Sequence, residues 1–86
     1  MRFKLLFSPL AIRGAELRNP IFTTGHDTGL VVDNRPTDAL VAYHRARARG
    51  GVGLVILQAT GVHPTARFSD HLLMADDDSC IPHFRK

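Results

Sequence analysis

The sequence predicts an α/β fold built on a parallel strand–helix–strand unit, and three observations support that prediction. Residues 21–24 form a short β-branched and aromatic run between a proline and a glycine. Residues 37–49 show helical periodicity, and residues 52–57 are apolar throughout. Continuous apolar character is typical of a strand covered on both faces, because a half-exposed strand alternates. A right-handed crossover through the helix would set the two strands parallel.

The helix between these strands has clear start and end signals. Thr37 is placed to cap its first turn, and Asp38 puts a carboxylate at the positive end of the helix dipole. Gly50–Gly51 supplies a residue that can take the left-handed conformation that ends a helix. Arg45 and Arg49 point away from the apolar stripe that we expect to lie on the sheet. That stripe consists of Ala39, Leu40, Ala42, Tyr43 and Ala46.

The remaining segments are expected to be turns and loops, with one further helix. Short apolar pieces around Arg13–Gly14 predict a small turn or hairpin ahead of the first strand. Residues 25–35 and 58–67 lack apolar periodicity and are predicted as two long loops. The acidic residues 76–79 predict the entry to a helix at residues 80–84.

Two physical objections oppose taking these residues as a complete domain. A two-stranded parallel sheet leaves both edges unpaired, and one amphipathic helix cannot cover both of its apolar faces. The helix at residues 80–84 is also too short to be stable by itself. We therefore expect residues 1–86 to be an N-terminal fragment of one larger domain, with no linker or second domain inside it.

Composition argues against several classes of function. Lys and Arg outnumber Asp and Glu by only 11 to 8. The densest basic group, Arg45, Arg47 and Arg49, is spread around a helix and does not form a stripe that follows a phosphate backbone. Residues 1–7 have a charged start followed by a short apolar run, which ends at Ser8–Pro9, far short of a signal peptide or membrane span. We expect a cytoplasmic protein without nucleic-acid or membrane partners.

The common motifs for nucleotide and metal binding are not matched. Gly51–Gly53 lies between a helix and a strand, whereas the dinucleotide fingerprint places its glycines between a strand and a helix. Cys80 is the only cysteine, and the five histidines show no i, i+4 pair. Asp76–Asp78 lacks the alternation of a calcium loop. We predict no metal site and expect His44 to lie at the helix surface.

The position of two loops points to a ligand site. Parallel α/β folds bind ligands at the carboxyl ends of their strands. Residues 24–29 follow the first strand and residues 58–64 follow the second, and both are rich in small and hydrogen-bonding side chains. Such loops let a planar ligand approach the backbone closely. On composition alone, two ordinary surface turns remain an equal alternative.

An ordered set of motifs along nearly the whole chain resembles the start of the old yellow enzyme family of flavin oxidoreductases. The motifs are Leu6–Leu10, Leu17–Ile21, Pro36–Asp38 with Tyr43, Ala46–Leu54, and Val62–Pro64 with Arg67. No single motif is diagnostic. Their order and spacing make the set specific.

The resemblance implies the opening part of a (β/α)₈ barrel that binds FMN. In that family NADH or NADPH reduces the flavin, which passes hydride to a small molecule with an activated alkene; some relatives oxidise N-methyl amines. Flavin contacts carry over to Thr24, Gly25, His26, Asp27 and Ala59. No catalytic residue carries over, because the substrate-binding and proton-donating groups come later in the family. The resemblance leaves open whether an iron–sulfur cluster follows, and it does not give the oligomeric state.

Thr28–Leu30 with Gly25–His26 looks most similar to the dienoyl-CoA reductase and trimethylamine dehydrogenase branch, yet four positions depart from the family. Pro20 stands where the family usually has a basic residue. Gly25 stands where many members have proline, and Gln58 stands where glutamate is common. Asp27 stands where the amine dehydrogenases carry a flavin-linked cysteine, so no cysteinyl link is expected there. A carboxylate near the flavin would instead tune its reactivity.

A binding or interaction module is the alternative function. A small α/β binding or interaction module that stands alone would use the basic helix surface formed by Arg45, Arg47 and Arg49 as its contact. A reading frame that continues into further strand–helix units would favour the flavoenzyme, and one that ends at Lys86 would favour the module.

Overall fold

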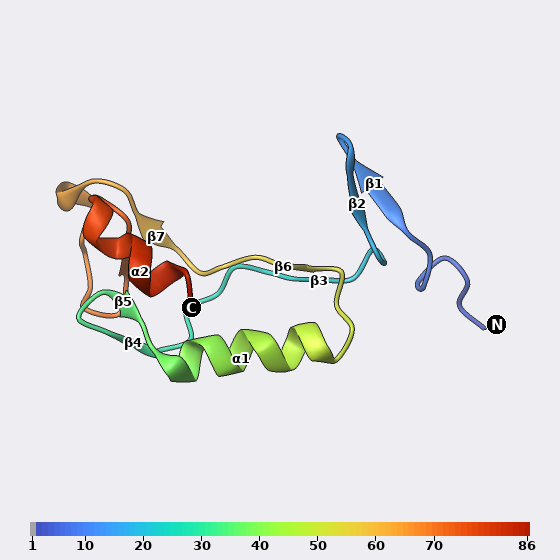
Figure 1. The fold of residues 1–86 in the computed structure, drawn as a ribbon, viewed down its shortest axis with the longest axis horizontal. Helices are drawn as coiled ribbons and strands as arrows, with labels where there is room; N and C mark the ends of the chain where they lie inside the picture. Colours follow the sequence, from blue (N-terminus) through green and yellow to red (C-terminus); the bar gives the residue numbers. More distant parts are fainter. Residues whose placement is uncertain (1) are drawn as a thin grey trace.

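The computed structural model describes residues 2–86 and confirms the strand–helix–strand unit. Strand β3 (Phe22–Thr23) pairs with β6 (Leu54–Val55) in parallel. Helix α1 (Asp38–Arg49) connects them and runs alongside the pair (Figure 1). The strands are shorter than the predicted ranges, but backbone hydrogen bonds from Gly53 N to Ile21 O (2.8 Å) and from Ile56 N to Thr23 O (3.2 Å) extend the pairing at both ends.

The segment before β3 forms a hairpin, as the sequence predicts. Strands β1 (Leu10–Ile12) and β2 (Ala15–Leu17) pair antiparallel. The two turn residues, Arg13 and Gly14, have φ values of 46° and 85°. Two successive left-handed residues are the requirement of a tight two-residue hairpin turn. The hairpin lies at the N-terminal end of the elongated molecule, away from the other short sheets (Figure 1).

A second hairpin corrects the prediction of one long loop at residues 25–35. Strands β4 (Val31–Val32) and β5 (Arg35–Pro36) pair antiparallel around Asp33 and Asn34, whose φ values are 52° and 58°. Short polar side chains tolerate this left-handed conformation, so the pair makes the turn without a glycine.

The prediction of an irregular loop at residues 58–67 was also wrong in part. Strand β7 (Thr60–Gly61) pairs in parallel with β8 (Leu73–Met74), and a short 3₁₀ turn, η1 (Pro64–Ala66), lies between them. The final helical stretch is confirmed. It consists of the 3₁₀ turn η2 (Asp78–Cys80) and helix α2 (Ile81–Phe84), and Asp77 caps its start by accepting from Ser79 N.

Helix α1 begins and ends where the sequence predicts, but only Leu40 and Tyr43 of the predicted stripe pack inward. The Thr37 hydroxyl accepts from Leu40 N at 3.1 Å, and Gly51 has a φ of 111° just after the helix. The face that packs inward carries the larger side chains: Leu40 is buried, and Val41, Tyr43, His44 and Arg47 are half-buried. Ala39, Ala42 and Ala46 of the predicted stripe are exposed. Burying Leu40 and Val41 removes more apolar area from water than burying alanine, which explains the rotation. The expectation that His44 lies at the surface was therefore wrong.

The core lies between α1 and the short strands. Val31, Leu40 and Leu73 form its buried cluster, with Leu30 and Phe84 packed against it. The apolar run at residues 52–57, which contains β6, is not covered on both faces by residues 2–86, because Leu54, Ile56 and Leu57 are each about 40% exposed. Residues 2–86 form four two-stranded sheets and do not close a barrel. No helix in this described range is long and apolar enough to cross a membrane.

Candidate functional site

Arg18 and Asn19 fix the turn that leads from α1 into β6. The Arg18 guanidinium donates to the carbonyl oxygens of Ala48 (2.5 Å) and Val52 (3.0 and 3.2 Å). Asn19 is buried; its Nδ2 donates to Gly51 O at 2.7 Å. A cation at the end of a helix also stabilises the helix dipole. These contacts set the register of β6 on β3 and so place the loops that follow both strands.

The two predicted loops lie side by side at the carboxyl ends of the parallel pair. A Cβ atom on Gly25 would stand 3.0 Å from Leu57 O, so these two backbones are in close contact. One step further on, the Thr28 hydroxyl donates to Gln58 Oε1 at 3.2 Å, and Gln58 Nε2 donates to His71 O at 3.2 Å. Gln58 is only 3% exposed. The buried amide therefore holds together the loops after β3 and β6.

All five sequence-predicted site residues lie on the exposed side of these loops. Thr24, Gly25, His26 and Asp27 form one continuous exposed segment after β3. Ala59 follows the buried Gln58 and is also exposed. Among residues 2–86, the backbone N–H groups of residues 25–27 donate no hydrogen bond. These donors are therefore not used by the described part of the chain.

The His26 side chain is engaged by the protein at both ring nitrogens. Nδ1 lies 2.7 Å from Thr24 O, and Nε2 lies 2.6 Å from the Tyr43 hydroxyl. Tyr43 belongs to α1, and its ring meets the His26 ring edge to face with centroids 5.6 Å apart. The predicted site segment is thus tied to the helix, which the sequence alone does not indicate.

His44 is a functional candidate that sequence reasoning misplaced. It lines a small apolar pocket of about 100 Å³ with Pro36, Leu40, Val41, Leu57, His83 and Phe84. Neither ring nitrogen has a hydrogen-bond partner among the described residues. Burial, aided by repulsion from His26 and Arg47, lowers the pKa of His44 below its usual value. The apolar walls therefore favour the neutral ring.

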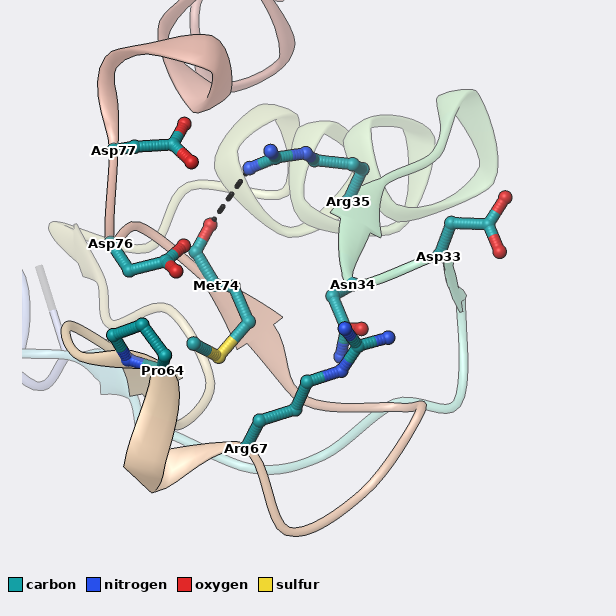
Figure 2. A pocket seen from close by; sticks show the side chains of 8 residues that line it. All are labelled: Asp33, Asn34, Arg35, Pro64, Arg67, Met74, Asp76 and Asp77. Carbon is teal, nitrogen blue, oxygen red and sulfur yellow. Dashed lines mark hydrogen bonds between the residues drawn. The ribbon is translucent and has the colours of Figure 1, made fainter.

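A larger polar pocket lies between β5, η1 and the start of η2, and sequence reasoning did not find it (Figure 2). Its volume is about 340 Å³, and it is lined by Asp33, Asn34, Arg35, Pro64, Arg67, Met74, Asp76 and Asp77. Arg35 donates to Met74 O (3.1 Å) and to the Ser79 hydroxyl (2.6 Å), and so joins β5 to β8 and η2. Hydrogen bonds from Ser79, with the charge of Arg35, lower the pKa of Asp77. None of the five predicted site residues lines this pocket.

The titratable side chains of residues 2–86 do not gather into a metal-binding group. No cluster of three or more His, Cys, Asp or Glu side chains in this range could hold an ion. Cys80 is buried and free.

Comparison with known proteins places the chain in a family. The model of the NADH:flavin oxidoreductase / NADH oxidase family matches residues 5–86. The chain is 35% identical over 82 residues to a metal reductase of Desulforamulus reducens, covering 95% of this chain and 12% of that protein. It is 39% identical over 82 residues to an NADPH dehydrogenase of Geobacillus thermodenitrificans, covering 90% of this chain and 23% of that protein.

These matches confirm the resemblance found in the sequence motifs. The chain spans less than a quarter of the length of either relative, so activity of the whole protein is a separate question. The family itself is established by a match over almost every residue. The chain belongs to the NADH:flavin oxidoreductase / NADH oxidase family.

Proposed function

We propose that the protein containing this chain is an FMN-dependent oxidoreductase that draws hydride from NADH or NADPH. In this proposal the chain opens a (β/α)₈ barrel, and Thr24–Asp27 with Ala59 forms one wall of the flavin site. Family membership and the similarity to a protein named NADPH dehydrogenase support the proposal. The old yellow enzyme resemblance makes an activated alkene the hydride acceptor.

The proposal that Thr24–Asp27 and Ala59 form one wall of the flavin site rests on one observation. Two loops at the carboxyl ends of parallel strands are held together by the Thr28–Gln58 hydrogen bond and by the contact of Gly25 with Leu57. This is the edge at which parallel α/β folds bind their ligands. Although these contacts join the two loops, Thr24–Asp27 and Ala59 remain exposed. The ends of the strands are thus fixed while the site residues stay accessible.

The residues present fit a flavin ring. The ring is planar and carries carbonyl oxygens and ring nitrogens along one edge, so it needs a flat approach and hydrogen-bond donors. Gly25 and Ala59 offer little side-chain bulk, and the backbone N–H groups of residues 25–27 have no protein acceptor among residues 2–86. Bound FMN would supply the hydride-transfer chemistry. The chain's part is to bind and orient the ring.

The test uses the full protein that contains this chain. It should purify with FMN or bind added FMN stoichiometrically, and NADH or NADPH should bleach the flavin absorbance in the absence of oxygen. An enone should then restore that absorbance. A full protein that binds no flavin would contradict the proposal. A chain that folds and acts alone through Arg45, Arg47 and Arg49 would support the interaction-module alternative.

A further inference from the structure

We propose that Tyr43 is a positioning residue for the flavin-facing segment Thr24–Asp27 and that it acts through His26. The inference rests on the proposed function, because the segment matters only if a ring lies against it. Its structural basis is the hydrogen-bonded chain from the Tyr43 hydroxyl through the His26 ring to Thr24 O, with distances of 2.6 and 2.7 Å.

The two partners determine where the proton of His26 lies. A carbonyl oxygen can only accept, so Nδ1 carries a hydrogen and donates to Thr24 O. In the neutral ring Nε2 is then an acceptor, and the Tyr43 hydroxyl donates to it. Both ends of the imidazole are thereby fixed. The ring closes the turn from Thr24 to His26 and ties that turn to α1.

Tyr43 is itself held in place on the helix. The guanidinium of Arg47, one turn further along α1, lies 3.4 Å from the centroid of the Tyr43 ring. Arg47 Nη1 also donates to the Tyr43 carbonyl oxygen at 2.9 Å. The His44 ring packs edge to face against the Tyr43 ring, with a centroid distance of 5.3 Å. A hydroxyl on a ring packed in this way is a fixed anchor for a loop that is otherwise exposed.

In this arrangement the side chain and the backbone of the predicted site have different roles. His26 has no free ring nitrogen, since one meets Thr24 O and the other meets Tyr43. Its contribution is to hold the backbone, whose N–H groups at residues 25–27 stay available. Without the Tyr43–His26 hydrogen bond, the backbone N–H groups of residues 25–27 would move relative to the flavin ring. FMN binding would weaken, because the entropy cost of ordering the segment would then be part of the binding free energy.

The test compares three variants of the full protein. Tyr43→Phe removes only the hydroxyl and keeps the ring beneath Arg47. His26→Ala removes both hydrogen bonds. His26→Gln keeps an acceptor that can meet the Tyr43 hydroxyl, so it should restore part of the loss. Thr65→Val is the matched control, because it also removes a hydroxyl that is hydrogen-bonded to an exposed histidine ring. Thr65 lies in η1, and its hydroxyl is 2.8 Å from His63 Nδ1.

Two measurements are made on each variant. The first is the FMN dissociation constant of the apoprotein; Tyr43→Phe should raise it roughly two- to tenfold, the range expected for one net hydrogen bond. The second is the backbone order parameter of residues 24–27, measured by NMR relaxation without FMN, which should be lower in Tyr43→Phe and His26→Ala because the segment is less restrained. Thr65→Val should match the unaltered protein in both, and His26→Gln should lie between.

The two measurements separate the outcomes. Unchanged order parameters at residues 24–27 in Tyr43→Phe would overturn the positioning role whether or not FMN binds. Lower order parameters with an unchanged FMN dissociation constant would overturn the importance of Tyr43 for flavin binding. Absence of FMN binding by the unaltered protein would contradict the proposed function, while the order parameters would still decide whether Tyr43 holds the segment.

Discussion

Gly53 packs directly against Asn19, and no larger residue fits between their backbones. A Cβ atom on Gly53 would overlap the Asn19 carbonyl oxygen and would stand 2.9 Å from Asn19 Oδ1. This close approach accompanies the hydrogen bond from Asn19 Nδ2 to Gly51 O. The glycines at positions 51 and 53 therefore serve helix termination and packing, as their place between a helix and a strand indicates.

Replacing Gly53 by alanine should destabilise the protein. The added methyl group meets backbone atoms, which cannot move aside as the end of a flexible side chain can, so a loss of about 1–3 kcal/mol in the free energy of unfolding is expected. Urea unfolding of the full protein measures it. Gly50→Ala is the control, because Gly50 has an ordinary helical φ of −69° and its nearest contact would be Ala46 O at 3.3 Å. Equal losses in the two variants would contradict the packing role of Gly53.

His44 should make the stability of the protein depend on pH. Its pKa is lowered in the folded state by burial, so the unfolded chain binds the proton more readily. The stabilisation is present above the unfolded pKa of about 6.5 and is lost as pH falls through the lower folded value. The free energy of unfolding should therefore decline below about pH 6.5.

A variant without the imidazole tests this directly. His44→Phe keeps an aromatic ring in the apolar pocket and should flatten the pH dependence between roughly pH 7 and pH 5. His71→Phe replaces an exposed histidine and should leave the dependence as it is. Identical pH profiles for His44→Phe and the unaltered protein would show that another group is responsible.

Asp27 should lower the reduction potential of bound FMN. A carboxylate beside a ring that gains electrons opposes the gain, so Asp27→Asn should shift the potential upward, by an amount on the order of tens of millivolts. Titration of the full protein against a reference dye measures the shift. Asp70→Asn, an exposed carboxylate in the segment after η1, is the matched control. A potential that does not change in Asp27→Asn would mean that the carboxylate is turned away from the ring.

The elements that the sequence predicts correctly are those with strong local signals. Thr37 caps α1, Gly51 follows its end with a left-handed φ, and Arg13–Gly14 turns the first hairpin. The parallel pairing of β3 and β6 follows from the handedness of the crossover. The β7–β8 pair was missed because each strand has only two residues, too few for any periodicity to show.

The nearness of the two loops was predictable, but their detailed contacts were not. Parallel topology places the loops after β3 and β6 at one edge of the sheet, whereas the choice of Thr24–Asp27 and Ala59 comes from the family resemblance and stays a prediction. The His26–Tyr43 hydrogen bond depends on how the loop folds back on α1, which no local pattern in the sequence reports. The face of α1 that packs inward, and with it the burial of His44, depends on partners such as Phe84 that are distant in sequence.

The most direct test of the central claim is the FMN dissociation constant of the full protein with a bulky side chain at Ala59. Ala59→Leu adds volume on the proposed flavin-facing wall and should weaken FMN binding by about tenfold or more. Ala66→Leu makes the same change at another exposed alanine, in η1, and should leave the dissociation constant unchanged. If Ala59→Leu bound FMN as tightly as Ala66→Leu, the paired loops after β3 and β6 would not be the flavin wall.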